Sequence, residues 1–450
     1  MTSALLHNYL LASRGKYCLQ MPGKELPRVY ADIFAGLVAE FGIFLQDKFE
    51  PPELVCVYSG TAHAETIALD DGRPVIVYDQ YLGQILNRLS RLYLEQAPEP
   101  EVSAYLSKIS AARCLVAGKP GSALRHAALF AGLADNLTTA GHKTDGRRGI
   151  YIHVGETFVL AHELVHFLYR SNGSAALLLE DFYLELISAM GLREPPKWGQ
   201  LLSDERVTKT RMSLDRFNSR QRLLRERGDL PSGLSRAEII KQFSKGLPKF
   251  MRRYGTITPY LLEECVCDGI AVLITVSRAM QEGIRIGDSV LGAFLALHNL
   301  RLLRWIDEIV ALPGKGIKDS GGTFFKGIRG QTQLRFDLFR YIVDAWLCCL
   351  WHGFEPDAIF LGNGQPGGRN GAFGLIDAMT DLNEQYAEVI FDHATSSFWI
   401  RHEKTARIID LDSVLRFNPG EDTYDVVRRV CNLPGWHAPQ WRGPRTRAAD

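Results

Sequence analysis

The stretch that decides the fold of the central region runs from Phe158 to Leu168 and reads FVLAHELVHFL. Every position except the two histidines and the glutamate is apolar, which predicts a helix that is buried on nearly all sides. Because residues four apart lie on one face of a helix, His162 and His166 present two imidazoles to one point in space. These imidazoles and the Glu163 carboxylate would lose their hydration without compensation unless something binds them.

The spacing of these residues is typical of a metal site. A His-Glu-x-x-His helix binds zinc through both histidines, and its glutamate serves as general base. Zinc lowers the pKa of a bound water to about 7 and polarises a carbonyl, so that a neighbouring carboxylate can take the proton. We therefore expect His162 and His166 to bind Zn²⁺ and Glu163 to act as general base in a hydrolytic reaction. The alternative is a pair of core histidines that hydrogen-bond to backbone or carboxylate groups.

A catalytic zinc keeps one position for water and therefore needs a third protein ligand. The stretch from Leu261 to Ala271 is mostly apolar and places Glu264 and Asp268 one helical turn apart on one face. We expect Glu264 to bind the metal and Asp268 to accept a ring N–H from one of the two histidines. The alternative is that the acids of this stretch pair with arginines such as Arg252 and Arg253.

These two stretches together resemble the gluzincin metallopeptidases, in which a glutamate on a later helix completes a His-Glu-x-x-His site. The resemblance covers approximately residues 149 to 275 and implies a zinc-dependent peptidase that acts on peptides or proteins. Residues 158–168 also resemble the active-site helix of soluble bacterial metallopeptidases related to phage-repressor and stress-regulator proteases. That family takes its third ligand from much nearer, which here points to Glu180, Asp181 or Glu185.

A metallopeptidase binds an extended substrate along a sheet edge by strand addition. The residues from Ile150 to Val154 are β-branched or aromatic apart from one histidine and end at Gly155, so we expect a strand directly before the metal-binding helix. That strand would bring two possible oxyanion donors near the site. The donors considered are Tyr151 and His153 on this strand, and Tyr254 and Tyr260 near the later helix.

The order of periodic segments predicts an α+β protein with a mainly helical, zincin-like core, a small β-sheet and a C-terminal α+β extension. We expect an N-terminal α+β region at 1–148, a catalytic region at 149–311 and the extension at 331–450, with a glycine-rich linker at 312–330. Strands are expected at Leu54–Tyr58 and Pro74–Tyr78. Helices are expected at Ala31–Gln46, Tyr81–Gln96, Ser122–Leu137, Glu156–Tyr169, Pro259–Met280, Val290–Val310 and Leu334–Trp351.

Charge and hydropathy restrict the location and the partners. The 52 basic and 51 acidic side chains nearly cancel, so no overall field attracts nucleic acid or anionic lipid. No apolar stretch has the length of a membrane span, and the N-terminus lacks the charge pattern of a secretory signal, so we expect a cytoplasmic protein. The eight cysteines are expected to be reduced and mostly buried, including Cys265 and Cys267 beside Glu264.

Two functions from other classes stay open. One is a non-catalytic regulator in which the zinc site is structural or vestigial and the C-terminal region binds a protein partner. The other is a nucleic-acid-associated protein that uses the basic segment from Arg206 to Arg227. Such segments are more often solvated surface, so a nucleic-acid partner is not the expected one.

Overall fold

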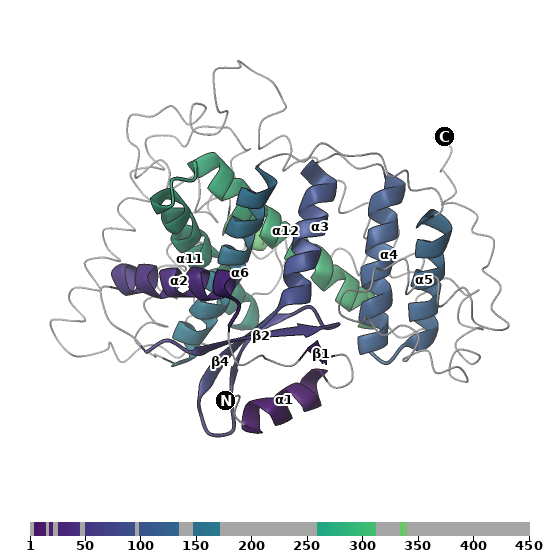
Figure 1. Ribbon diagram of the computed structural model, residues 1–450, viewed down its shortest axis with the longest axis horizontal. Coiled ribbons are helices and arrows are strands. Elements are labelled where there is room, and N and C mark those ends of the chain that lie inside the picture. Colours follow the sequence, from purple (N-terminus) through teal and green to yellow (C-terminus); the bar gives the residue numbers. More distant parts are fainter. Residues whose placement is uncertain are drawn as a thin grey trace, which may run out of the picture.

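The computed structural model describes residues 4–14, 18–20, 26–45, 50–94, 99–134, 147–171, 259–311, 334–336 and 338–339. These residues form a mainly helical structure with one small mixed β-sheet (Figure 1), which confirms the α+β class. In chain order the elements are α1 (Ala4–Arg14), β1 (Cys18–Gln20), α2 (Arg28–Leu45), β2 (Glu53–Ser59), β3 (Ala64–Ala68), β4 (Pro74–Asp79), α3 (Gln80–Leu94), α4 (Glu99–Val116), α5 (Pro120–Ala134), α6 (Arg148–Ser171), α11 (Pro259–Gln281) and α12 (Ile286–Ala311).

The sheet has the strand order β1-β2-β4-β3, so within the described residues β3 lies at an edge. Strand β2 runs parallel to β4 and antiparallel to β1, and β3 is antiparallel to β4. Both β2 and β4 were predicted, because each is a nearly continuous apolar run. Strand β3 was not predicted, because its sequence, AETIA, is short, has Ile67 as its one large apolar residue and is only partly buried.

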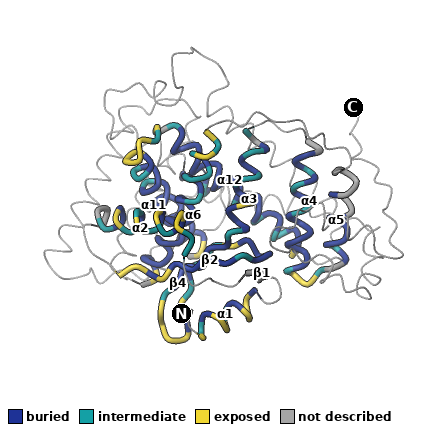
Figure 2. The backbone as a smooth tube through the Cα atoms, viewed as in Figure 1, coloured by how far each residue is buried: buried dark blue, intermediate teal, exposed yellow. Residues whose placement is uncertain are grey.

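Alternate residues of β2 and β4 belong to two different apolar clusters, as the two-residue period of a strand requires. Those on one face pack against Leu6 and Leu10 of α1. Those on the other face join the main core, which extends through α2, α3, α6, α11 and α12. Figure 2 shows that β2 and β4 are largely buried while one side of α1 is exposed. The sheet is therefore covered on both faces, and its main-core face supports α6.

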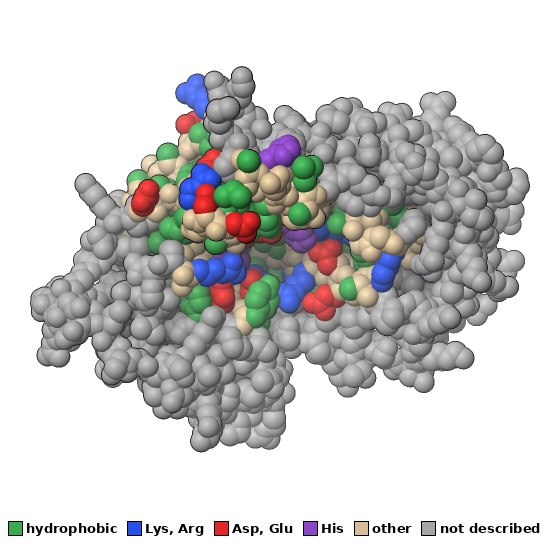
Figure 3. All heavy atoms as spheres, turned by 90° about the horizontal axis from the view of Figure 1, so that it is seen from below, with side chains coloured by type: hydrophobic (Ala, Val, Ile, Leu, Met, Phe, Trp, Pro, Cys, Tyr) green, Lys and Arg blue, Asp and Glu red, His purple; other side chains and the backbone are tan. Residues whose placement is uncertain are grey.

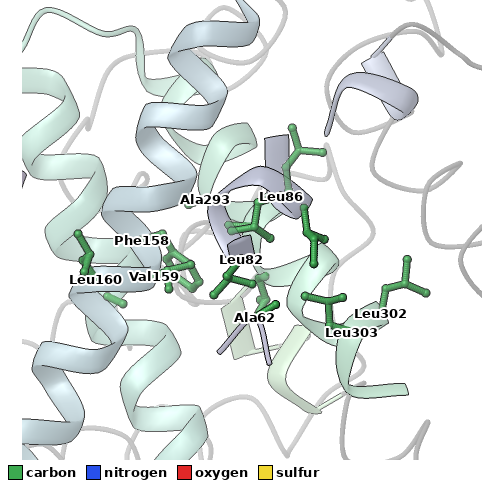
Figure 4. Close-up of a cluster of buried hydrophobic side chains, with 14 of the residues drawn as sticks. Ala62, Leu82, Leu86, Phe158, Val159, Leu160, Ala293, Leu302 and Leu303 are labelled. Atoms are coloured by element: carbon green, nitrogen blue, oxygen red, sulfur yellow. The ribbon is translucent and has the colours of Figure 1, made fainter. Parts of the chain in front are cut away.

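Helix α6 lies at the centre of the main core and contacts α11, α12, α3 and β3. In Figure 4, Val159 of α6 lies on the side of Leu82 of α3, while Leu160 lies on the opposite side of α6 from Leu302 and Leu303 of α12. All of these residues belong to the main core. This surrounding apolar packing explains why the residues from His162 to His166 are all buried. Among the helices that the structure describes, none combines the length and apolar character needed to cross a bilayer.

The predicted strand at Ile150–Val154 is wrong, because these residues form the first turns of α6. Gly155 was interpreted as the end of a strand, but it lies inside the helix where α6 crosses α12. A Cβ atom on Gly155 would lie 3.4 Å from the Ala296 Cβ, and one on Gly292 would lie 2.7 Å from the Val154 Cβ. Tertiary packing at this close crossing therefore overrides the strand preference of β-branched residues.

Gly292→Ala is expected to destabilise the protein by about 1–3 kcal/mol, because the added methyl group overpacks a backbone contact between two helices. Chemical denaturation, followed by circular dichroism, measures the change. The matched control is Gly149→Ala in α6, where a Cβ meets nothing within 4 Å and alanine favours the helix. Equal unfolding midpoints for the two variants would contradict the close α6–α12 contact.

Candidate metal centre

The two motif histidines and Glu264 meet at one point between α6 and α11. The Nε2 atoms of His162 and His166 lie 3.1 Å apart. The carboxylate of Glu264 lies 3.7 Å from the first Nε2 and 3.5 Å from the second. One ligand atom from each residue lies within 4.8 Å of the others, and all three residues are buried. The structure therefore brings together the three ligands that the sequence analysis predicted.

A carboxylate also lies at the other ring nitrogen of each histidine. Nδ1 of His162 is 3.0 Å from Oδ1 of Asp268, the aspartate predicted to accept a ring N–H, but the contact does not have the geometry of a hydrogen bond. Nδ1 of His166 is 2.8 Å from Oε1 of Glu263, a residue to which sequence reasoning gave no role at the metal. A carboxylate beside Nδ1 favours the tautomer that carries its hydrogen on that nitrogen, which makes Nε2 available to a metal.

The donor set fits a divalent cation. When both imidazoles are neutral with hydrogen on Nδ1, two Nε2 lone pairs and a carboxylate converge here, and a cation among them would bind all three. Burial lowers the pKa of His166, but Cys267, Glu263 and Glu264 outweigh burial and raise it above its ordinary value, so the surroundings favour a positive charge here. A catalytic zinc site of this type has two imidazoles and one carboxylate as protein ligands and leaves one position for water.

Glu163 lies beside this cluster and is held by the edge strand. The hydroxyl oxygen of Thr66 on β3 lies 2.7 Å from the backbone carbonyl oxygen of Glu163 and 3.0 Å from its Oε2. The Glu163 side chain is buried and lines the same cavity as the predicted ligands. Strand β3 therefore positions the carboxylate that the sequence analysis assigned as general base.

Two arginines neutralise the acids of α11. Arg335, in the described segment 334–336, places Nη1 2.9 Å from Oε2 of Glu264 and Nη2 2.8 Å from Oδ1 of Asp268. Burial raises the pKa of Glu264, but Arg335 and the two histidines hold it well below its usual range. Arg170 of α6 contacts Glu263 at 2.9 Å. The acids of α11 therefore contact both histidines and arginines. Arg252 and Arg253, the arginines named as alternative partners, lie outside the described residues.

The cluster opens into a cavity of about 440 Å³. Residues from β3, α3, α4, α6, α11 and α12, together with Arg335, form its walls. Figure 3 shows the hollowed face with histidine, acidic and basic side chains gathered inside it. A molecule bound in this cavity can therefore contact the three predicted metal ligands and Glu163 at the same time.

Of the possible oxyanion donors, Tyr260 lines this cavity. Burial and a hydrogen bond with Glu264 raise the pKa of its hydroxyl. Tyr151 donates to Asp288 at 3.0 Å and His153 contacts Glu282 at 2.8 Å, and neither is in the cavity wall. The expectation that these two lie near the site is therefore wrong, because their segment is helical.

Several predictions fall on residues outside the described ones. These are Tyr254, the nearer ligands Glu180, Asp181 and Glu185, the basic segment from Arg206 to Arg227, the linker at 312–330 and most of the extension at 331–450. Cys265 and Cys267 are buried free thiols on α11, as expected.

No known protein family, curated protein or solved structure matches this chain.

Asp268→Asn and Glu263→Gln are each expected to weaken zinc binding about 10–100-fold, because each removes the carboxylate that holds a ligand imidazole in place. Competition with a chromophoric chelator measures the affinity. Glu282→Gln is the matched control, since Glu282 lies 2.8 Å from a histidine outside the cavity, as Glu263 does from His166. Undiminished affinity in both test variants would show that these acids do not orient the ligands.

Proposed function

We propose that this protein is a zinc-dependent peptidase in which His162, His166 and Glu264 bind the metal and Glu163 is the general base. One observation carries the proposal: two Nε2 atoms and a carboxylate converge in a buried cluster, and Glu163 lines the same cavity. The carboxylates near both Nδ1 atoms support it, because carboxylates in these positions orient the imidazoles that bind a metal.

The reaction proposed is hydrolysis of an amide bond. When bound, zinc supplies Lewis acidity, which makes water easier to deprotonate and polarises a carbonyl group. The Glu163 carboxylate takes a proton from the water as the water oxygen bonds to the carbonyl carbon. Glu163 then returns that proton to the amide nitrogen as the C–N bond breaks and the amine leaves. The Tyr260 hydroxyl is the proposed hydrogen-bond donor to the negative charge on the carbonyl oxygen.

A peptide is the proposed substrate because a β-strand edge borders the cavity. Strand β3 has one neighbouring strand among the described residues, and its first residues line the cavity. Arg14 keeps β3 in place, since it contacts Glu65 on β3 at 2.7 Å and Asp79 on β4 at 3.1 Å. An extended peptide that pairs with β3 would place its carbonyl groups beside Glu163, which contacts Thr66.

Incubation of the zinc-loaded protein with a complex peptide mixture tests this function. Mass spectrometry is expected to detect new peptide termini that disappear after metal chelation and return after zinc is added. Cleavage that survives complete removal of the metal would exclude this mechanism. A protein that binds one zinc ion per chain but cleaves no peptide would favour the non-catalytic regulator instead.

A further inference from the structure

Strand β3 turns backbone groups toward its outer side at alternate residues. At the hairpin between β3 and β4, the Leu69 N–H donates to the Arg73 carbonyl oxygen at 2.9 Å, so these two residues are a hydrogen-bonded pair. Hydrogen-bonded pairs alternate with non-hydrogen-bonded pairs along an antiparallel ladder. The register of β3 and β4 therefore puts the N–H and C=O groups of Ala64, Thr66 and Ala68 on the outer side of β3, away from β4.

An arginine occupies the outward carbonyl group of Thr66. Nη1 of Arg170 donates to this oxygen at 3.0 Å. The same guanidinium donates from Nε to Oε1 of Glu263 at 2.9 Å, so it is held from two sides although the side chain is half-exposed. Arg170 lines the cavity, whereas Ile67 and Ala68 do not. The part of β3 that borders the cavity therefore ends at Arg170.

A second arginine occupies the carbonyl groups on the other side of Ala64. Arg113 of α4 is buried, and its Nη1 donates to the Thr61 carbonyl oxygen while its Nη2 lies 3.4 Å from the Ala62 carbonyl oxygen. The Ala62 N–H donates to Oδ2 of Asp79 at 3.0 Å. Within the described part of the chain, no side chain contacts the backbone of Ala64, which lines the cavity. Its carbonyl group is therefore the acceptor that remains for a peptide N–H.

A peptide paired with β3 would direct its own N–H groups toward β3 at alternate residues, because a strand has a period of two. One of these N–H groups would meet the Ala64 carbonyl oxygen. The next would meet the Thr66 carbonyl oxygen, where Arg170 already lies on the outer side. A hydrogen bond from a charged group is about twice as strong as one from a neutral amide, so the peptide N–H does not displace the guanidinium.

We propose that Arg170 limits the pairing of a peptide substrate with β3 to one substrate residue, the one opposite Ala64. The inference rests on the proposed peptidase function and names the backbone feature that its site recognises. The substrate residue opposite Ala64 must carry a backbone N–H, whereas the residue opposite Thr66 needs none. Proline, which has no N–H, is therefore accepted at the second position and excluded from the first.

The test measures peptide binding to the zinc-loaded Glu163→Gln variant by fluorescence anisotropy, so that it does not depend on turnover. The probe is the tightest-binding member of a library of hexapeptides with blocked ends. Each of its amide N–H groups is replaced in turn by an ester oxygen, which removes one donor without adding bulk. We expect one ester to weaken binding at least about tenfold, and the esters two residues to either side of it to change binding less than about twofold.

The variant that tests the limit is Arg170→Met, added to Glu163→Gln, because it deletes the guanidinium and frees the Thr66 carbonyl group. We expect a second sensitive ester in this variant, two residues from the first, since the peptide N–H there gains an acceptor. Arg170→Lys keeps a donor and is expected to retain the single sensitive position. Arg88→Met is the matched control, since Arg88 contacts Glu101 at 3.0 Å outside the cavity.

A second sensitive ester at this spacing while Arg170 is present would overturn the limit, and so would an unchanged ester pattern in Arg170→Met. Absence of binding by every hexapeptide would also overturn it. The expected ester pattern without any cleavage by the zinc-loaded wild type would instead overturn the peptidase and leave the pairing limit standing. Cleavage by the wild type without any sensitive ester would overturn the pairing limit and leave the peptidase standing.

Discussion

Glu163→Gln is expected to reduce peptide hydrolysis by about 10²–10⁴-fold while the variant still binds one zinc ion per chain. The amide keeps the size of the carboxylate and can still accept a hydrogen bond from Thr66, so the local structure is preserved. It cannot take a proton from water, and the proposed reaction depends on that transfer. Single-turnover rates measure the loss, and elemental analysis measures the metal content.

The control for this variant is Glu282→Gln, which changes a glutamate outside the cavity and is expected to keep the wild-type rate. Retention of zinc is the decisive measurement, because it separates general-base chemistry from metal binding. A variant that loses its zinc would make Glu163 a ligand, and one that hydrolyses at the wild-type rate would remove it from the mechanism.

We expect a larger loss of zinc affinity when a ligand is removed, in His162→Ala, His166→Ala or Glu264→Ala, because each change deletes a donor atom. The loss should exceed roughly 100-fold, which is the most expected when a carboxylate beside a ligand histidine is changed. Equilibrium dialysis against buffered zinc measures the effect. His153→Ala is the matched control on the same helix, since His153 contacts Glu282 outside the cavity. Circular dichroism without metal shows whether a variant has lost its fold instead of its ligand.

Glu264→Ala also decides between the two families that the sequence resembles. If Glu264→Ala binds zinc normally and Glu180→Ala does not, the third ligand is the nearer one and the role given to α11 is wrong. Loss of zinc from Glu264→Ala alone would agree with the convergence of Glu264 and the two histidines. Arg335 still contacts Asp268 when Glu264 is truncated. A loss of zinc from Glu264→Ala can therefore be attributed to the missing ligand.

The sequence by itself determined the parts of the site that follow from local periodicity. His162 and His166 converge because they are four residues apart on one helix, and this holds wherever the helix packs. Glu264 and Asp268 share a face of α11 for the same reason, and their burial required cationic or hydrogen-bonding partners. The sequence did not determine whether those partners were histidines or arginines, and in the structure both kinds contact these acids.

Tertiary structure alone decided which distant groups complete the site. Thr66, Glu263 and Arg335 carry no local pattern that assigns them to the metal centre, because each acts through a neighbour at least 67 residues away in sequence. The strand expected at 150–154 failed for a related reason: its strand preference is weak compared with the packing of α6 against α12 at Gly292. Sequence periodicity specifies which face of an element is buried, but long-range packing determines what lies against that face.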